Sequence, residues 1–363
     1  MTEPEIPLTR YLPLTDLVDA VSELFSAAGL STAAAHDVAT SLVDSDARGI
    51  ASHGVMLTPM YLARLRAGSV STATRARVVR DEQAVAVLDA ERMLGQLSAR
   101  QGMDLAVTKA AGFGVGVVTV HDAFHFGAAG AYARRAADAG FIGIAMANTR
   151  PLMPAPGGAE PVVGNNPLAF AAPTAGAPVV VDLALSEVAL GRIRNAEAEG
   201  TAIPPTWATD HEGRPTTDPA AAIKGMLLPT GGRKGFGLAL MVELLTGALS
   251  GGAITTDVAG LYHDVTAPNG SSHTFIALDP SRFPGATEFR RGSTLLADRV
   301  RSSTRAPGSA PVRLPGDGSS EAARRSAEIG VPVSPATLRA LAAAAEEFGT
   351  ASTVFQEGDS HVR

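Results

Sequence analysis

The side chains best suited to acid–base chemistry lie in one stretch, from His121 to Ile193, where polar residues, glycine and proline alternate with short apolar runs. Glycine and proline supply the backbone angles that loops need, and apolar strands on either side hold such loops rigid. His125 lies in one of these loops, where an imidazole titrates near neutral pH and can exchange a proton with a substrate oxygen. The pattern predicts an acid–base role for His125, and a structural histidine is the alternative that the spacing leaves open.

A metal site is a second interpretation of the same histidines. His121 and His125 are four residues apart, a spacing that aligns side chains on a helix, but here they flank a strand end and a glycine turn. The chain has no cysteine, and no acidic cluster accompanies the pair. We therefore expect no bound metal. A metal-assisted hydrolase or lyase that uses His121, His125 and His53 remains an alternative, and it predicts loss of activity with a chelator.

The segment RGIASHGV places Ser52 next to His53 at a helix-to-loop junction. Adjacent residues of an extended segment cannot face each other as nucleophile and base, and no GxSxG motif surrounds Ser52 or Ser186. A serine hydrolase is therefore not favoured. Asp44, Asp46 and Arg48, just before this junction, are typical of a solvated helix end.

Glycine-rich segments offer two candidate phosphate sites. Gly112, Gly114 and Gly116 spell GxGxG, but they follow a helix and precede a strand, the reverse of the order that a Rossmann loop requires. The segment GGRKGFG opens a helix, so its backbone N–H groups and Lys234 could hold a phosphate. A plain capped core helix is the alternative there.

Apolar residues recur at helical spacing over the first 70 or so residues. They predict a helix capped by Thr15, a second helix capped by Ser31, and a short third helix from Pro59 to Gly68. A further helix is expected to start at Ser186. The remaining expected helices cover 96–111, 128–139, 238–249, 287–303, 321–329 and 335–348, and the last two should fold back onto the first three.

Short β-rich runs alternate with these helices in the middle of the chain. Strands are expected near 78–90, 116–121, 141–148, 167–172 and 178–184, and from His273 onward. This order predicts a mixed α/β class. We expect a helical lobe for substrate binding and dimerisation from residues 1–75 with about 285–363, and a mixed α/β cofactor-binding lobe from residues 76–284.

Composition restricts the partners and the compartment. The 363 residues are 45% hydrophobic but 5% aromatic, so the core is built mainly from alanine, valine and leucine. The formal net charge is −6 and no basic run is present, which argues against nucleic acid as a partner. No window approaches about 18 consecutive apolar residues, so no membrane span is expected. Together with the absence of cysteine, these features predict a cytoplasmic protein.

Several segments, in the same order, together resemble the type-2 malate/L-lactate dehydrogenase family, which includes sulfolactate and ureidoglycolate dehydrogenases and cyclic-imine reductases. The resemblance covers essentially the whole chain. It implies a fold unrelated to the Rossmann type, in agreement with the failed search for a dinucleotide loop. The segments that carry it are RGIASHGVMLTPMYLARLRAG, HFGAAGAYARRAADAGFIGIAMANTRP, APGGAEPVVGNNPLAFAAP, VVVDLALSEVALGRI, IPPTWATDHEGRPTTDP, LLPTGGRKGFGLALMVELLTGALSGG and VRLPGD.

The resemblance implies a role for each motif. The histidine of the HFG motif, His125, would be the proton donor and acceptor, with Ser52 and His53 of the SHG motif beside the substrate. Tyr61 would line the substrate pocket. Residues implied to contact NAD or NADP are Asn148, Thr149, Asp182, Leu183, Ala184, Leu185, Ser186, Lys234 and Gly235. A homodimer with the active site close to the subunit interface is implied as well.

The implied reaction moves a hydride between a nicotinamide and the carbon of a 2-hydroxy or 2-oxo acid. The family usually has an arginine after SHG that pairs with the substrate carboxylate, but this chain has Leu57 there. A leucine cannot replace the planar, charged fork of an arginine. Arg150 is the nearest substitute by motif, and Arg48 is a further candidate. A cyclic-imine reductase, or a repurposed member with a substrate that lacks a carboxylate, is the alternative.

Other departures from the family pattern lie on both sides of the site. Ala51 replaces an aspartate before SHG, and Asn165 replaces a threonine. On the cofactor side, Leu185 and Arg233 replace a threonine and an aromatic residue. Arg233 beside Lys234 adds positive charge, which a 2′-phosphate would use.

Overall fold

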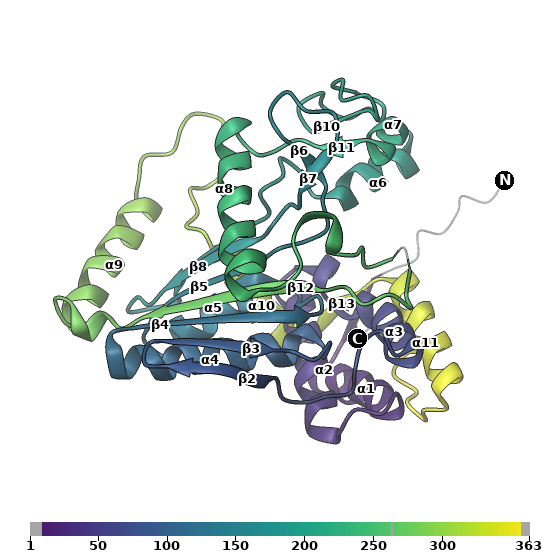
Figure 1. Cartoon of the computed structure of the whole chain (residues 1–363), viewed down its shortest axis with the longest axis horizontal. Coiled ribbons are helices and arrows are strands. Elements are labelled where there is room, and N and C mark those ends of the chain that lie inside the picture. The colour runs from purple at the N-terminus through teal and green to yellow at the C-terminus, as the bar shows by residue number, and fades with distance from the viewer. Residues whose placement is uncertain (1–8, 263, 357–363) are drawn as a thin grey trace.

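A seven-stranded mixed sheet lies at the centre of the molecule in the computed structural model, which describes residues 9–262 and 264–356 (Figure 1). Its strand order is β2-β3-β4-β12-β5-β8-β9, and every neighbouring pair is antiparallel except β3 with β4. This sheet confirms the mixed α/β class. The strands are β2 (Arg77–Glu82), β3 (Val85–Asp89), β4 (Val115–Ala123), β5 (Ile142–Ala147), β8 (Leu168–Ala172), β9 (Val179–Leu183) and β12 (Ser271–Leu278).

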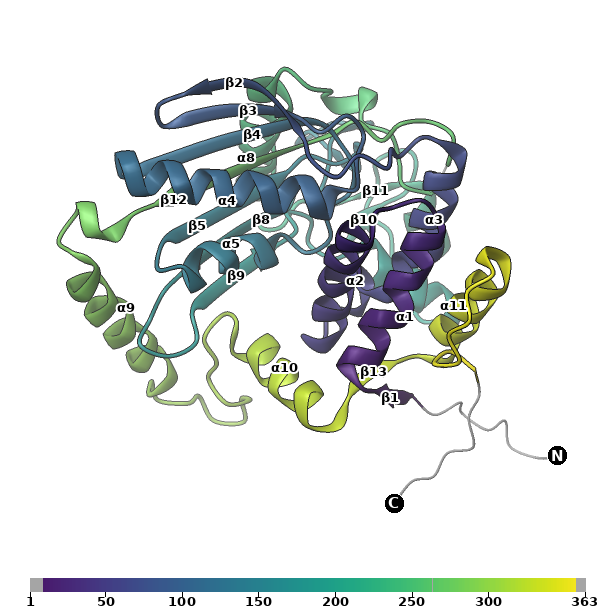
Figure 2. The ribbon, with the colours of Figure 1, turned by 90° about the horizontal axis from the view of Figure 1, so that it is seen from below.

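Two helices, α4 (Gly95–Phe113) and α5 (Ala129–Asp138), cover one face of the sheet (Figure 2). Small residues let them approach closely. A Cβ on Gly116 of β4 would clash with the carbonyl oxygen of Ala106, and one on Gly143 of β5 would clash with that of Ala133. The alanine-rich composition therefore produces close helix-on-sheet packing.

The other face carries α8 (Arg233–Glu243), which continues into a π-helical turn, η3 (Leu244–Ala248). Thr274 of β12 donates a hydrogen bond of 2.5 Å to the carbonyl of Leu245, which ties this turn to the sheet. The sequence predicted a helix from 238 onward. The helix starts earlier, so the glycine-rich segment is its first turn.

The N-terminal helices are α1 (Leu14–Ala27), α2 (Thr32–Ala47) and α3 (Thr58–Ala67), with short turns η1 (Ala51–His53) and η2 (Val55–Leu57) between the last two. Ser31 caps α2 as predicted, by accepting a hydrogen bond from the amide of Ala34. The prediction that Thr15 caps α1 is wrong. Pro13 is the N-cap residue, and the Thr15 hydroxyl donates to Asp16 inside the first turn.

The C-terminal segments return to these helices, as predicted. Strand β13 (Val331–Val333) pairs with β1 (Arg10–Leu12), α10 (Asp317–Ile329) packs on α2, and α11 (Pro335–Phe348) packs on α1 and α3. Helix α9 (Ala286–Arg301), preceded by η5 (Pro280–Arg282), lies at the far end of the sheet from α1 (Figures 1 and 2). The division into residues 1–75 with 285–363 and residues 76–284 remains a prediction.

A smaller unit above the sheet is built from β6 (Met153–Pro154), β7 (Pro161–Val163), β10 (Ala208–Thr209), β11 (Met226–Leu227), α6 (Leu190–Glu199) and α7 (Pro219–Lys224), and η4 (Thr255–Asp257) follows later in the chain. It has its own apolar cluster, around Leu185 and Ile193. The prediction that Ser186 caps a helix is wrong, because Ser186 is bridged to Pro229 in extended backbone and α6 begins at Leu190. No helix in the described residues could cross a membrane.

Candidate active site

Three side chains from separate elements meet where strand β4 ends. His125 follows the strand, and its Nδ1 lies 2.6 Å from the hydroxyl of Tyr61 on α3. The ring of His53, from η1, stacks on that of His125 with centroids 5.6 Å apart. The structure therefore brings together the SHG motif, the pocket tyrosine and the HFG histidine that the sequence singled out.

The surroundings of His125 favour its neutral form. Burial lowers the pKa of His125 to about 3, and the nearby His53 and His273 act in the same direction. His273 of β12 is fully buried and stacks on Phe126, with ring centroids 4.5 Å apart. The imidazole of His125 is therefore neutral near pH 7, with a nitrogen lone pair that can accept a hydrogen bond or a proton.

Ser52 and His53 contact each other directly. The Ser52 hydroxyl lies 2.9 Å from Nδ1 of His53. The expectation that these neighbours cannot face each other is wrong, because the segment is a 3₁₀ turn and not an extended strand. Burial also lowers the pKa of His53.

Asp46, near the end of α2, fixes the turn that carries Ser52 and His53. Its carboxylate accepts a hydrogen bond of 2.6 Å from the amide of Val55, and a Cβ on Gly54 would overlap it. The solvated helix end that the sequence predicted is wrong for Asp46, which is 5% exposed, because the following turns fold over it. Burial raises the pKa of Asp46 to about 7.

Gln96, in the first turn of α4, extends the hydrogen-bond chain behind His125. Its Nε2 lies 3.0 Å from the Tyr61 hydroxyl, and its side chain is buried. Nothing in the local sequence pointed to Gln96, because its partner comes from α3, 35 residues earlier. Burial raises the pKa of Tyr61 well above its ordinary value, so the phenol keeps its proton.

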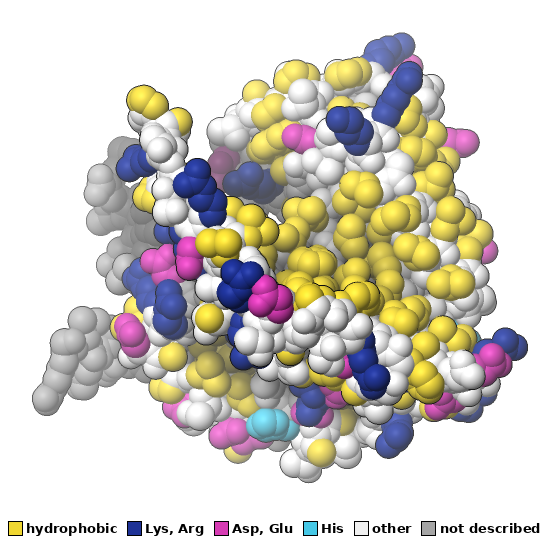
Figure 3. All heavy atoms as spheres, turned by 90° about the vertical axis from the view of Figure 1, so that its left-hand side faces the viewer, with side chains coloured by type: hydrophobic (Ala, Val, Ile, Leu, Met, Phe, Trp, Pro, Cys, Tyr) yellow, Lys and Arg dark blue, Asp and Glu magenta, His cyan; other side chains and the backbone are white. Residues whose placement is uncertain are grey.

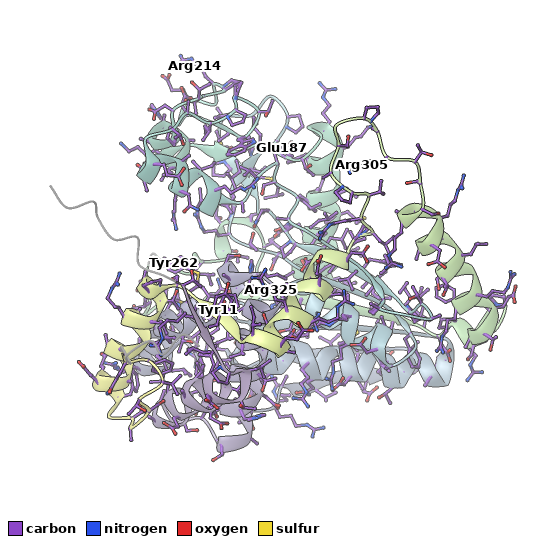
Figure 4. All side chains as sticks on the ribbon, turned by 180° about the vertical axis from the view of Figure 1, so that it is seen from behind. Tyr11, Glu187, Arg214, Tyr262, Arg305 and Arg325 are labelled. Carbon is purple, nitrogen blue, oxygen red and sulfur yellow. The ribbon has the colours of Figure 1, made fainter. Side chains whose placement is uncertain are left out.

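A buried arginine holds the wall beside Tyr61. Arg64 is fully buried, lies over the ring of Phe124, and donates to backbone carbonyls that include those of Leu261 and Ala267. The loop that it holds carries Tyr262, which lies between the small upper unit and the terminal helices (Figure 4). Sequence reasoning missed Arg64, since an arginine at helical spacing predicts a solvated face.

The two arginines proposed to bind the substrate carboxylate, Arg48 and Arg150, differ in whether they are free to do so. The guanidinium of Arg48 is 2.9 Å from both carboxylate oxygens of Asp44, so it is already paired. Arg150 lies just after β5 with its side chain exposed, and partial desolvation by its neighbours and the charge of Arg194 lower its pKa. Leu57 is buried in the main apolar cluster.

The side chain of Asn148 is used within the protein. Its amide donates to the carbonyl of Ala253 at 2.9 Å and to Glu243 at 3.3 Å, and its oxygen accepts from the amide of Ser272 at 2.7 Å. Asn166 donates to the same carboxylate at 2.7 Å. This network fixes α8 against β5, and the backbone amide of Asn148 is used as well, since it donates to the carbonyl of Ser272 at 3.1 Å.

Thr149 and Leu185 are joined through Asn165. The Thr149 hydroxyl donates to the Asn165 side chain at 2.9 Å, and the amide of Leu185 donates to the Asn165 carbonyl at 2.7 Å. Thr230, which leads into α8, donates to the carbonyl of Leu185 at 3.0 Å. Three of the predicted cofactor segments are therefore contiguous.

The segment from Asp182 to Ser186 changes from exposed to buried along its length. Asp182 accepts from the amide of Gly130 at the start of α5, and burial raises its pKa. Leu183 and Ala184 are exposed, whereas Leu185 is buried and Ser186 donates to the carbonyl of Val188. Exposed apolar side chains here suit a flat ring.

Lys234 and Gly235 lie in the first turn of α8, as the sequence predicted for a phosphate site. Lys234 is exposed, and a Cβ on Gly231 or Gly232 would meet open space. No residue of the turn itself is acidic, but the carboxylate of Glu187 accepts a hydrogen bond of 3.3 Å from the amide of Gly231. Helix N-termini with a free lysine bind phosphates. These residues fit the pyrophosphate of a dinucleotide.

Comparison with known proteins places the chain in a family. Residues 12–342 match the model of the malate/L-lactate dehydrogenase family. The chain is 34% identical to an L-sulfolactate dehydrogenase of Methanothermobacter thermautotrophicus over 91% of its length and 95% of that protein. It is 36% identical to an NAD(+)-dependent ureidoglycolate dehydrogenase of Escherichia coli, over 84% of the chain and 87% of that protein.

Solved structures agree with this assignment. The sulfolactate dehydrogenase of Methanocaldococcus jannaschii superposes with a TM-score of 0.89 at 33% identity, covering 94% of this chain and 98% of that one. A Δ1-piperideine-2-carboxylate reductase from Pseudomonas syringae has a TM-score of 0.84 at 29% identity, covering 93% and 100%. The chain belongs to the malate/L-lactate dehydrogenase family, with its non-Rossmann fold, and is an oxidoreductase.

Proposed function

We propose that this protein transfers a hydride between NAD or NADP and the C2 carbon of a 2-hydroxy or 2-oxo acid, with His125 as proton donor and acceptor. The observation that carries the proposal is the meeting of His125, Tyr61 and His53 at the end of β4. Tyr61 occupies Nδ1 of His125, which leaves Nε2 for the substrate oxygen. The cofactor supplies the hydride chemistry, and the protein supplies orientation and proton transfer.

The substrate lies against Ser52, His53 and Tyr61 in this proposal. An anionic substrate would raise the pKa of His125 toward neutrality and so offset the effect of burial. Arg150 is the carboxylate partner, because Arg48 is paired with Asp44 and Leu57 has no charge. This assignment replaces the arginine that the family motif would provide.

The three contiguous segments that end at α8 would hold the cofactor. Lys234 and Gly235 would bind its pyrophosphate, while Asn148, Thr149 and the segment from Asp182 to Ser186 would form the surface beside its rings. Relatives use NAD(+) in one case and NADP(+) in another. Measuring KM for each cofactor separates them, and Arg233→Ala should weaken NADP binding alone if Arg233 contacts a 2′-phosphate.

A cyclic-imine reductase is the second candidate. The similarity to a piperideine-carboxylate reductase favours it. Hydride would then add to a C=N carbon, and His125 would protonate the nitrogen. Turnover on cyclic imines but not on 2-oxo acids would select this candidate, and bound cofactor without turnover on either class would indicate a repurposed protein.

We infer a homodimer in the cytoplasm. Large apolar side chains are exposed along α8 and η3, and Leu295 and Leu296 of α9 are each 65% exposed. Figure 3 shows apolar side chains spread over the face that α9 overhangs. Monomeric proteins rarely leave so much contiguous apolar surface in water, whereas homodimer interfaces are apolar. The exposed large apolar residues of α8 and η3 are Leu238, Leu240, Met241 and Leu244.

His125→Ala tests the proposal. The variant should bind cofactor as the wild type does and lose about 100-fold or more in kcat, the usual contribution of a general acid–base residue. Intrinsic fluorescence and equilibrium dialysis check cofactor binding. Retention of most of the kcat would show that another group moves the proton.

A further inference from the structure

The chain of hydrogen bonds behind His125 leaves one buried atom without a partner. Oε1 of Gln96 makes no hydrogen bond to any described residue, although its Nε2 lies 3.0 Å from the Tyr61 hydroxyl. A half-turn of the amide exchanges its oxygen and nitrogen, and each orientation places one end of the amide against the Tyr61 hydroxyl. Gln96 can therefore either donate to Tyr61 or accept from it.

The two orientations of Gln96 correspond to different tautomers of His125. When Gln96 donates, the hydroxyl hydrogen of Tyr61 points to Nδ1, so neutral His125 carries its own hydrogen on Nε2. When Gln96 accepts that hydroxyl hydrogen, the phenol oxygen accepts from Nδ1–H and Nε2 keeps a lone pair. Only the second arrangement lets Nε2 take a proton.

We propose that Gln96 is a positioning residue that accepts the Tyr61 hydroxyl hydrogen and thereby holds His125 in the tautomer with a free Nε2. This inference rests on the proposed function, in which Nε2 exchanges the substrate proton. During oxidation the hydroxyl proton moves to Nε2, the O–H electron pair becomes the second carbonyl bond, and the hydride passes from carbon to oxidised NAD or NADP. The Nδ1–H bond to Tyr61 is unchanged throughout.

The packing around Gln96 keeps the hydrogen-bonded residues Gln96, Tyr61 and His125 in place. Its neighbour Gly95 lies so close to the loop that a Cβ would clash with the carbonyl oxygens of Phe124 and His125. Gln96 itself is 3% exposed. The start of α4 and the His125 loop are therefore held at a fixed separation.

No charged group among the described residues near His125 could orient the Tyr61 hydroxyl in place of the Gln96 side-chain amide. The titratable groups that face it are His53 from η1, Tyr61 from α3 and His273 from β12. Burial keeps Tyr61 protonated and both other histidines neutral near pH 7, since it raises the pKa of the phenol and lowers those of the imidazoles. The uncharged Gln96 is then the group that orients the Tyr61 hydroxyl.

The test replaces the amide with a side chain of similar length that accepts no strong hydrogen bond. In Gln96→Met, ¹⁵N NMR of the histidine-labelled, cofactor-free protein should show His125 changed from the Nδ1–H to the Nε2–H tautomer, with the resonance assigned from His125→Ala. The kcat should fall about 100-fold, while KM and the Kd of the cofactor stay within about twofold of the wild type.

Gln96→Glu restores an acceptor. An ionised carboxylate accepts from Tyr61 and also favours the imidazolium. This variant should keep the Nδ1–H tautomer and most of the kcat, and the midpoint of its pH profile should move to higher pH. A Gln96→Glu enzyme as inactive as Gln96→Met would overturn the proposal.

Two further variants test whether the effect depends on the hydrogen bonds from Gln96 through Tyr61 to His125. Gln101→Met makes the same change on α4 at a side chain that bonds only the backbone of Ala76, and it should leave tautomer and kcat unchanged. In a Tyr61→Phe background, adding Gln96→Met should cause no further loss, because the link is already cut.

An Nε2–H tautomer in the wild-type protein, or an unchanged tautomer and pH profile in Gln96→Met, would overturn the inference. Its failure differs from that of the proposed function. If His125→Ala retained turnover, the proton-transfer assignment would be wrong whatever Gln96 does. If His125→Ala were inactive and Gln96→Met normal, only the role of Gln96 would be wrong.

Discussion

The environment of single side chains, more than their identity, determines their protonation in this protein. His125 and Asp46 show opposite cases of the same effect, since burial disfavours the charged form of each. It lowers the pKa of the imidazole to about 3 and raises that of the carboxyl to about 7. Both groups are therefore uncharged in mildly acidic solution, between these two pKa values.

Asp46→Asn should change how stability depends on pH. Because the folded-state pKa of Asp46, about 7, lies above its unfolded value, the wild type loses stability as the pH rises from the unfolded pKa to the folded one. The loss is about 1.4 kcal/mol for each pH unit between the two pKa values. The asparagine oxygen can still accept from Val55, so the variant should lack this loss. Urea unfolding at about pH 5, 6, 7 and 8 should show the free energy of unfolding of the variant rising relative to that of the wild type as the pH increases. A constant difference between the two free energies across this range would contradict the prediction.

Arg150→Met should impair recognition of an acid more than turnover. Loss of a guanidinium that pairs with a carboxylate should raise KM for a 2-oxo acid about 30-fold or more, because truncating one partner of such a pair costs about 2–5 kcal/mol. Arg150→Lys should be intermediate, since it keeps charge without the fork.

Arg214→Met is the matched control for Arg150→Met. Arg214 is exposed at the tip of the upper unit, far from Tyr262 (Figure 4), and pairs with Glu212. Its loss should leave KM unchanged. Equal KM values for Arg150→Met and the wild type would transfer the carboxylate role to another group.

At the scale of elements, the site depends on the close approach of α4 to the loop after β4. The helix starts at Gly95, and the absence of a side chain there lets its backbone lie against the carbonyls of Phe124 and His125. The turns η1 and η2 approach from the other side and rest on Asp46. No one element contains the site.

Gly95→Ala should separate α4 from this loop. The new Cβ would meet backbone oxygens that cannot move independently, so both the kcat and the urea midpoint should fall. Gly112→Ala, on the same helix, meets open space and should leave the kcat unchanged while adding up to about 1 kcal/mol of stability. Assays and urea titrations of the two variants side by side check this, and a fully active Gly95→Ala enzyme would contradict it.

At the scale of the molecule, the two faces of the sheet differ in how much apolar surface their helices leave exposed to solvent. Helices α4 and α5 cover one face, while α8 on the other face exposes Leu238, Leu240 and Met241. Helix α9 stands at the far end of the sheet (Figure 1), and both of its leucines are exposed. A second copy of the chain would bury this surface.

Leu295→Glu combined with Leu296→Glu should convert the proposed homodimer to a monomer. Two buried charges without partners cost more than the apolar contacts they replace. Light scattering after size exclusion should show half the wild-type mass. Leu14→Glu, at an exposed leucine of α1, is the control and should leave the mass unchanged. A wild-type protein of monomer mass would refute the proposed assembly.

Local signals accounted for most elements. Serine, proline and glycine at the ends of α2 and α3 act on their own few residues, so Ser31 and Gly68 marked those ends correctly. Thr15 and Ser186 are also residue types that cap helices, but neither caps one here. At α1 the N-cap is Pro13, two residues before Thr15, and at Ser186 the bridge to Pro229 holds the backbone extended. A capping residue predicts a helix start only where no other contact competes.

The sequence by itself determined the family and the mixed α/β class and pointed to His125, Ser52, His53 and Tyr61 as candidate site residues, because motif identity and local periodicity are properties of the chain. Only the tertiary structure decided what surrounds them. The stacking of His53 on His125, the burial of Asp46 and the link from Gln96 to Tyr61 each join segments that are distant in sequence or folded over one another. Burial and hydrogen-bond direction arise from such contacts, and no local pattern encodes them.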